Sequence, residues 1–135
     1  MPRTRAVFDA SVVLRAFLVD AEDARAWVGR AEARQVLAEA PELLFAECVH
    51  AIRRSVLAGR VPRTEAGGVV RAIVELPLRV RPNRELAIGA TARALTGRLS
   101  GYDAFYVVLA EATDAVLVTA DRRLAEAYDR VELLA

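Results

Sequence analysis

Four acidic residues lie next to apolar segments, where a charged carboxylate destabilises the fold unless it has a binding partner. They are Asp9, Glu47, Asp103 and Asp121. A carboxylate that leaves water is normally neutralised, hydrogen-bonded or bound to a cation. Several carboxylates in one place repel one another unless they are protonated or bridged, and hard divalent cations such as Mg²⁺ prefer oxygen ligands of this kind. The four acids therefore predict a metal site, provided that the fold brings them together.

Two of the acids follow predicted strands. Asp9 comes directly after the apolar run 6–8, and Asp121 comes three residues after the apolar run 115–118. Each precedes a helical pattern, and Asp is a preferred N-cap, so a cap is the simpler interpretation of either residue alone. If the two strands are neighbours, both carboxylates face one crevice at the carboxyl ends of the strands, where parallel sheets bind ligands.

The other two acids lie on predicted helices. Asp103 shares a helical stripe with Tyr106 and Val107, so we expect its carboxylate to point inward. Ser100 and Asp103 also fit a Ser-x-x-acid capping box, which can coexist with metal binding. Glu47 lies at the border of the apolar face of its helix, where a solvated flank position is the simpler interpretation of a lone Glu. A shared cation explains all four positions at once.

Two hydroxyl side chains accompany the acids that follow strands. Ser11 and Thr119 each lie two residues from an aspartate. We expect each hydroxyl either to orient a ligand or a bound water at the site, or to serve as a local cap.

The composition excludes several other chemistries. The single cysteine, Cys48, rules out an internal disulfide, and with the single histidine, His50, it rules out the common zinc sites, so a metal must be held by oxygen. The chain has no lysine, which argues against phosphoacceptor receivers and haloacid-dehalogenase-type phosphatases. A net charge of +1 gives no strong attraction to nucleic acid or membrane. No apolar run is long enough to cross a bilayer, so we expect a soluble, cytoplasmic protein.

Short apolar runs alternate with longer helical patterns, which predicts an α/β fold with a mostly parallel five-stranded sheet and helices on both faces. Strands are predicted over 6–8, 35–38, 78–80, 115–118 and 131–134. Helices are predicted over approximately 12–18, 21–32, 41–58, 64–75, 84–97, 101–113 and 122–128. Pro41 suits a first helical turn, and Gly59 suits a helix end.

Four segments together resemble PIN-domain proteins, and in particular the VapC-type ribonuclease toxins of bacterial toxin–antitoxin pairs. The segments are Val7–Ser11, Leu43–Ile52, Tyr102–Ala110 and Leu117–Ala125. The resemblance spans nearly the whole chain and implies one PIN-like three-layer nuclease domain over 1–135. It further implies an endoribonuclease that depends on Mg²⁺ or Mn²⁺ and holds the metal with the four acids. Family members of this sort are usually homodimers that bind a cognate antitoxin.

Arginines near these segments bear on the substrate. Some relatives carry a further acid shortly after the last acid of the quartet, whereas this chain has Arg122 and Arg123, which leaves a second metal in doubt and makes both arginines candidates for contact with RNA phosphates. Arg53, Arg54 and Arg60 form a possible RNA-facing strip, although a solvated helix face is the simpler expectation. Two alternatives stay open, a PIN-domain RNA-processing nuclease that is not a toxin and a non-catalytic binding domain. Transfer, ribosomal and messenger RNA all remain possible substrates.

Overall fold

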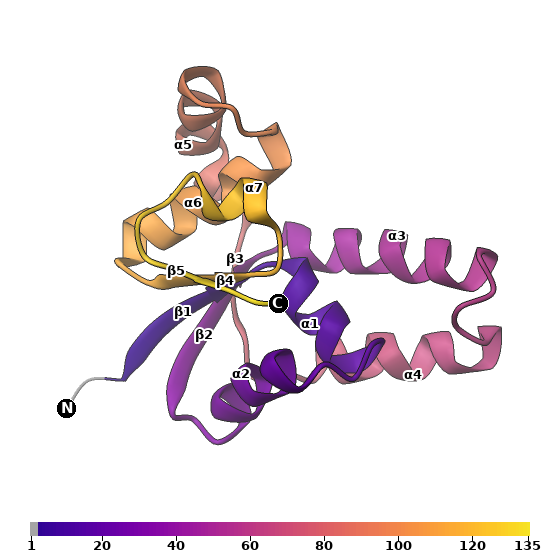
Figure 1. Cartoon of the computed structure of the whole chain (residues 1–135). Helices are drawn as coiled ribbons and strands as arrows, with labels where there is room; N and C mark the ends of the chain where they lie inside the picture. The colour runs from indigo at the N-terminus through magenta and orange to yellow at the C-terminus, as the bar shows by residue number, and fades with distance from the viewer. Residues whose placement is uncertain (1–2) are drawn as a thin grey trace.

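A computed structural model of the chain, in which residues 3–135 are described, shows five parallel strands between two layers of helices (Figure 1). The strands are β1 (Thr4–Phe8), β2 (Val36–Pro41), β3 (Arg79–Arg81), β4 (Val116–Thr119) and β5 (Val131–Leu133). Their order in the sheet is β3-β2-β1-β4-β5, and every neighbouring pair is parallel. The predicted α/β architecture is confirmed, and the sheet is parallel throughout rather than mostly parallel.

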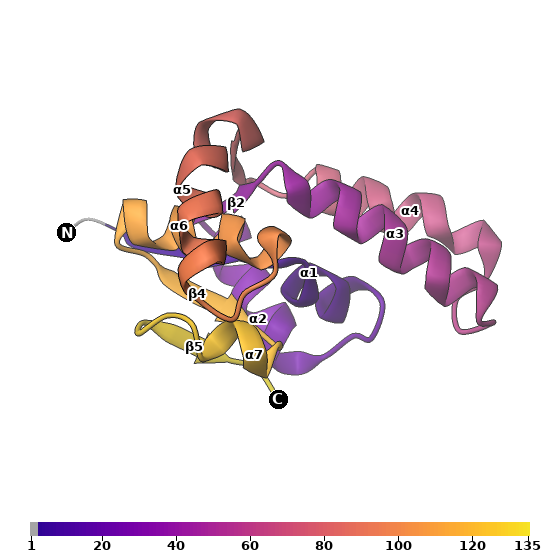
Figure 2. The ribbon, with the colours of Figure 1, turned by 90° about the horizontal axis from the view of Figure 1, so that it is seen from above.

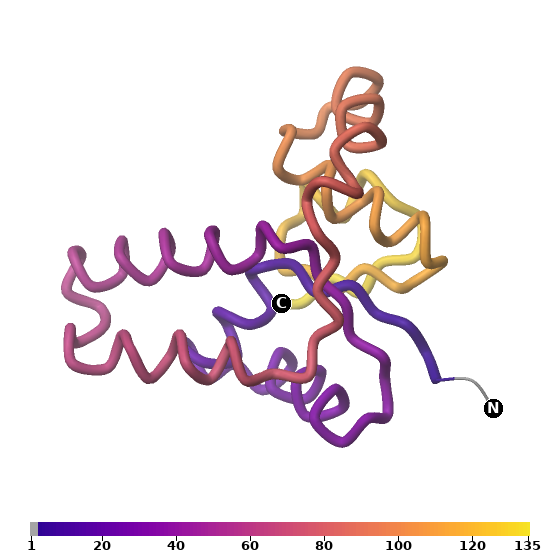
Figure 3. The backbone as a smooth tube through the Cα atoms, turned by 180° about the vertical axis from the view of Figure 1, so that it is seen from behind, coloured from indigo at the N-terminus to yellow at the C-terminus, as the bar shows by residue number. Residues whose placement is uncertain are grey.

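Seven helices lie within the described residues 3–135. They are α1 (Ala10–Phe17), α2 (Glu22–Glu32), α3 (Leu43–Leu57), α4 (Arg63–Val74), α5 (Asn83–Thr96), α6 (Gly101–Thr113) and α7 (Arg122–Ala125). Helices α1 and α2 cover one face of the sheet, whereas α6 covers the other face with α5 packed beside it (Figures 1 and 2). Helices α3 and α4 form an antiparallel hairpin that extends past the sheet (Figure 3). Over this same part of the chain, no helix has both the length and the apolar character needed to span a membrane.

The junction between β2 and α3 differs from the sequence prediction. Pro41 ends β2 instead of opening the helix, and the helix begins at Leu43. The strand runs longer than its apolar pattern because it pairs with β3 up to Pro41, and the backbone N–H of Glu42 then donates to the carbonyl of Arg81 at 2.9 Å. The prediction that Gly59 ends a helix is confirmed, since it follows α3 with a φ of +76°, which glycine adopts without strain.

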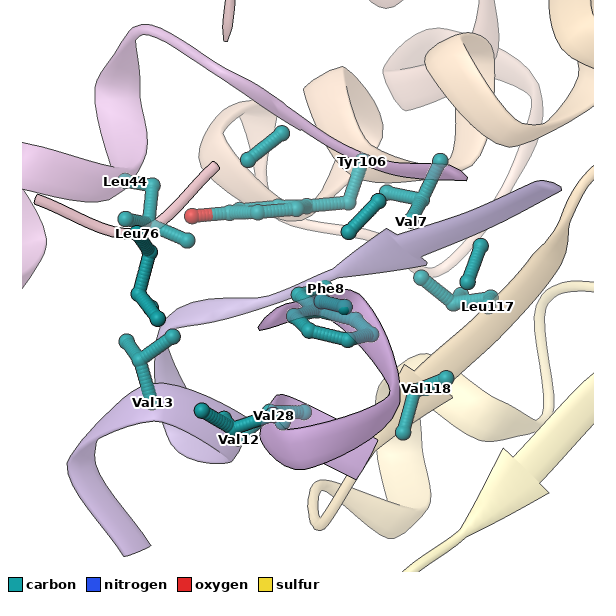
Figure 4. Packing of buried hydrophobic residues seen from close by; sticks show 14 of the residues in the cluster. Val7, Phe8, Val12, Val13, Val28, Leu44, Leu76, Tyr106, Leu117 and Val118 are labelled. Atoms are coloured by element: carbon teal, nitrogen blue, oxygen red, sulfur yellow. The ribbon is translucent and has the colours of Figure 1, made fainter. Parts of the chain in front are cut away.

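The central strand β1 explains why an acid follows an apolar run. Val7 points to the α6 face beside Tyr106, and Phe8 points to the α1 and α2 face beside Val28 (Figure 4). Parallel strands that are covered on both faces are mostly apolar, and β1 is fully buried from Ala6 to Phe8, so Asp9 stands where this buried run ends. Phe8 pairs with Val118 of β4, so the two strands are neighbours, which is the condition under which Asp9 and Asp121 were expected to face one crevice. The segments after β1 and β4 therefore leave the sheet side by side.

Candidate active site

A cavity of about 650 Å³ lies at the carboxyl edge of the sheet, between α1, α3, α6 and the segment after β4. Its lining includes all four predicted acids, Asp9, Glu47, Asp103 and Asp121. They come from four separate stretches of the chain, so only the folded chain brings them to one place. The cavity is therefore the candidate active site.

Asp9 is the most deeply buried acid of the cavity, with 6% of its surface exposed. Its Oδ1 accepts hydrogen bonds from the backbone N–H of Ser11 at 3.1 Å and from the Ser11 hydroxyl. Its Oδ2 accepts from the Thr119 hydroxyl at 2.7 Å. Asp9 is thus the N-cap of α1, as one interpretation predicted, and it also lines the cavity.

The proton positions on the two hydroxyls follow from their other partners. The Ser11 hydroxyl oxygen accepts from the backbone N–H of Ala120 at 2.9 Å, and the Thr119 hydroxyl oxygen accepts from the backbone N–H of Asp121 at 2.9 Å. Each hydroxyl has a single proton, which it donates to Asp9. The hydroxyls that we expected to orient a ligand or to cap locally therefore orient Asp9, and they tie α1 to the segment after β4.

The electrostatics of Asp9 are those of an acid that lacks a cation. Burial raises the pKa of Asp9 to about 6, the hydrogen bonds from Ser11 and Thr119 partly oppose this rise, and the charge of Asp121 adds to it. A second buried acid, Glu39 of β2, provides a contrast, because its Oε1 lies 3.0 Å from the Arg5 guanidinium. Within residues 3–135 no ion pair involves Asp9.

Glu47 is held by a buried tyrosine. The hydroxyl of Tyr106, on α6, donates a hydrogen bond to Oε1 of Glu47, on α3. Burial, together with the charge of Glu47, raises the pKa of Tyr106 far above its usual range, so this hydroxyl stays protonated and donates. Burial also raises the pKa of Glu47, the hydrogen bond from Tyr106 opposes that rise, and the charge of Asp103 adds to it. Tyr106 therefore positions Glu47 and favours its charged form.

Replacement of Tyr106 by phenylalanine should raise the pKa of Glu47 further and lower the free energy of unfolding by about 1 kcal/mol, because a half-buried carboxylate loses its donor. The pKa is measured by carboxyl ¹³C NMR titration, and the free energy by urea unfolding. The matched control is Tyr102→Phe, which changes an exposed tyrosine on the same helix. An unchanged pKa of Glu47 in Tyr106→Phe would show that this hydrogen bond does not position the carboxylate.

Asp103 and Asp121 combine capping with a place in the cavity. The backbone N–H of Asp103 donates to the Ser100 hydroxyl at 3.0 Å, which is one half of the predicted capping box. Burial raises the pKa of Asp103, the charge of Asp121 raises it further, and the Ser100 hydrogen bond and the charge of Arg123 oppose this. Asp121 is the N-cap of α7 and accepts from the backbone N–H of Arg123 at 2.9 Å. The predicted caps and the shared cavity therefore coexist.

Comparison with known proteins identifies the family of the chain. The family model of the PIN domain matches residues 6–130. This chain belongs to the PIN-domain family. Among curated relatives, "Ribonuclease VapC1" of Mycobacterium tuberculosis (strain ATCC 25618 / H37Rv) is 38% identical over 122 residues, which cover 88% of this chain and 91% of the relative. "Ribonuclease VapC9" of the same strain is 36% identical over 126 residues, covering 89% and 88% respectively.

Solved structures share the fold of this PIN domain. PAE2754 from Pyrobaculum aerophilum superposes with a TM-score of 0.69 at 23% identity, over 97% of this chain and 91% of that chain. VapBC2 from Rickettsia felis, bound to a DNA fragment from its promoter, gives a TM-score of 0.74 at 10% identity, over 98% and 100% respectively. At such identities the likeness shows the fold alone.

The donor set of this PIN domain fits a hard divalent cation. Four carboxylates line one cavity. The charge of Asp121 raises the pKa of both Asp9 and Asp103, and the charge of Asp103 raises the pKa of Glu47. No three acidic, histidine or cysteine side chains within residues 3–135 form a ready-made set of direct ligands. Mg²⁺ needs only one or two direct carboxylates and keeps several waters, through which the other acids can hold it. The residues fit a hydrated ion better than a fully protein-bound one.

Two residues that line the cavity differ from what the sequence led us to expect. Tyr106 was expected only as an apolar neighbour of Asp103, yet its hydroxyl holds Glu47. Arg54 lines the cavity, although a solvated helix face was the simpler expectation. The helical spacing of Tyr106 from Asp103 was an available signal, because it places both side chains on one face of α6. Arg122 and Arg123 are exposed on α7 and do not line the cavity, so their contact with phosphate stays a prediction.

Proposed function

We propose that this PIN domain is a metal-dependent endoribonuclease that hydrolyses RNA phosphodiester bonds and acts as the toxin of a toxin–antitoxin pair. The observation that carries the proposal is Asp9, a buried carboxylate with no cationic partner in the described chain and three further acids along the same cavity. Relatives of similar length are named ribonucleases. A non-catalytic domain has no use for clustered carboxylates that cost stability.

The proposed roles of the residues follow from their positions. Asp9, Glu47, Asp103 and Asp121 would hold Mg²⁺ or Mn²⁺, directly or through its waters. When bound, such an ion supplies Lewis-acid activation of water for in-line attack and stabilises charge on the phosphate and the leaving oxygen.

Other side chains hold the acids in position before the substrate binds. Ser11 and Thr119 fix the orientation of Asp9 before substrate arrives, so no reorganisation is needed during the reaction. Tyr106 holds Glu47 in the same way from the other side of the cavity. This preorganisation is what a site for charged substrates and ions requires.

A cognate antitoxin and a homodimer belong to the same proposal. Structures with this fold include "Toxin-antitoxin complex from Klebsiella pneumoniae", and VapBC2 and FitAB were both solved bound to DNA. We therefore expect an antitoxin that masks the cavity, and a cytoplasmic location where RNA is available. Growth arrest on expression of the chain alone, relieved by coexpression of its genomic neighbour, would support the toxin role over that of an RNA-processing enzyme.

The test of the reaction is the chemistry of the product ends. Cleavage should leave no 2′,3′-cyclic phosphate, because water attacks the phosphorus in place of the RNA 2′-hydroxyl. The chain has a single histidine and so lacks the histidine pair that would serve as acid and base for attack by the 2′-hydroxyl. Mass spectrometry of the fragments from a defined RNA distinguishes the two. Cyclic phosphate ends would contradict the proposed reaction.

A further inference from the structure

A second cavity, of about 610 Å³, opens beside the acidic one. It runs between α1 and the C-terminal half of α3, and three arginines line it, Arg15, Arg54 and Arg60. The two cavities share lining residues, so they form one continuous depression. The shared residues are Ser11, Leu14, Ala51, Arg54 and Asp121. We call the second cavity, defined by its three arginines, the arginine groove.

The guanidinium groups of the groove have N–H donors that are free to bind an anion. Within residues 3–135, Arg54 and Arg60 form no ion pair. Arg15 reaches Asp23 only at 3.9 Å, and its Nε is buried without a hydrogen-bond partner. Buried donors are normally satisfied, and like charges that share a groove repel one another, so such a set is stabilised by a bound anion. The one acid in the groove lining is Asp121, at the end next to the acidic cavity.

The fold places Arg60 in the groove through the end of α3. Gly59 has a φ of +76°, its N–H donates to the carbonyl of Val56 at 3.0 Å, and the N–H of Arg60 donates to the carbonyl of Ser55 at 2.9 Å. These two bonds form a Schellman motif, which turns the chain back along the helix it ends. Arg60 therefore sits in a fixed turn, more than one helical turn beyond Arg54.

The neighbouring arginine on α3 shows that this arrangement is specific. Arg53 is exposed, forms no ion pair in the described chain and lines a different groove, between α3 and α4. Successive residues of a helix point about 100° apart, so Arg53 and Arg54 face different surfaces. The possible strip of Arg53, Arg54 and Arg60 is therefore divided between two grooves, and Arg15 joins Arg54 and Arg60 in one of them.

We propose that the arginine groove binds the sugar–phosphate backbone of the RNA strand next to the scissile linkage, which rests on the proposed function. Arginine matches phosphate with paired donors, and several arginines along a groove suit a chain of phosphates. A strand that lies there leads directly to Asp121 and Ser11 at the edge of the acidic cavity. The positive groove also offsets the repulsion between RNA and the four acids, which a net charge of +1 alone does not do.

The test measures binding apart from cleavage. A short, fluorescently labelled 2′-O-methyl single-stranded RNA is titrated with the full chain in EDTA, and anisotropy gives the Kd at several salt concentrations. Arg54→Gln and Arg60→Gln should each weaken binding by about three- to tenfold, since each removes a charged contact to phosphate. Each should also reduce the slope of log Kobs against log salt by about 0.7 per lost phosphate contact. The matched control, Arg53→Gln, should leave both quantities unchanged.

The outcomes separate this proposal from the proposed function. If the wild-type chain cleaves RNA with Mg²⁺ but the Arg54→Gln/Arg60→Gln double variant keeps its RNA affinity within twofold, the groove assignment is wrong and the nuclease stands. The wild-type chain could instead bind RNA but fail to cleave it with Mg²⁺ or Mn²⁺, while the double variant loses RNA binding. In that case the groove assignment stands and the proposed nuclease activity is wrong. A fluorescently labelled poly-glutamate peptide is titrated in the same way. If the double variant binds this peptide more weakly but binds RNA as the wild-type chain does, the groove binds an acidic protein segment and the proposal is wrong.

Discussion

Asp9→Asn should lower RNA cleavage by about a hundredfold or more, and at pH 8 it should make the folded chain more stable. Cleavage falls because the variant removes the charge of the deepest acid in the cavity at nearly constant shape. Stability rises because wild-type Asp9 is charged, buried and without a cationic partner in the described chain. When a residue is needed for catalysis but destabilises the fold, its replacement lowers activity and raises stability.

The sign of the stability effect follows from the pKa of Asp9. Folding raises this pKa from 3.8 to about 6, so protonation favours the folded chain. The stabilisation of the folded chain by protonated Asp9 is fully present below about pH 4 and is lost as the pH rises through 6. At pH 8 the loss amounts to about 3 kcal/mol, which Asn avoids, although Asn gives up about 1 kcal/mol because it cannot accept hydrogen bonds on both sides. The net gain is about 1–2 kcal/mol at pH 8 and close to zero or slightly negative near pH 4.

Urea unfolding at pH 4 and pH 8, together with an RNA cleavage assay, checks both parts. The matched control is Asp20→Asn, at an exposed position whose φ of 58° asparagine also adopts readily. Its surface ion pair with Arg25 contributes little, so neither activity nor stability should change. Full activity of Asp9→Asn would contradict the proposed role, and a loss of stability at pH 8 would contradict the account of its buried charge.

Removal of divalent ions should abolish cleavage by the wild-type chain, and Mg²⁺ or Mn²⁺ should restore it. The expected loss is at least as large as that of Asp9→Asn, because the variant removes one of the carboxylates that would hold the cation, whereas chelation removes the cation itself. The ion should also stabilise the fold, by about 1.4 kcal/mol at tenfold excess over its Kd. Thermal unfolding in EDTA and in Mg²⁺ measures this effect independently of activity.

The Asp9→Asn variant is the control for the effect of the ion on stability. Its Tm should respond much less to Mg²⁺ than the Tm of the wild-type chain, because one carboxylate of the cavity is gone. Undiminished cleavage in EDTA would show that the reaction does not depend on a divalent ion. Equal stabilisation of both proteins by Mg²⁺ would mean that the ion binds somewhere other than this cavity.

Local patterns predicted most of the elements, because an element buries a stripe or a face that its own residues specify. The predicted strands and helices agree with the observed ones to within a few residues, apart from the junction at Pro41, where pairing of β2 with β3 extends the strand. The placement of Asp9 at the end of an apolar run was informative for the same reason. Strand β1 is fully buried from Ala6 to Phe8, and Asp9 follows where the strand reaches the edge of the sheet, whereas the buried acid inside β2, Glu39, is paired with Arg5.

The partners of each acid depended on contacts between distant segments. Thr119 and Asp9 are 110 positions apart and meet only because β1 pairs with β4, and Tyr106 reaches Glu47 only because α6 packs against the sheet next to the start of α3. No local pattern contains such information.

The order of residues alone was enough to predict an α/β chain with Asp9 and Asp121 after strands, Asp103 in a first helical turn and Glu47 at the border of an apolar helix face, since hydrophobic periodicity and capping act over a few residues. The folded chain decided which hydroxyls hold Asp9, and that Arg54 and Arg60 line the arginine groove while Arg53 lines a different groove. These features depend on the pairing order of strands and on the direction of α3 past the sheet. Both are set by the packing of the whole core.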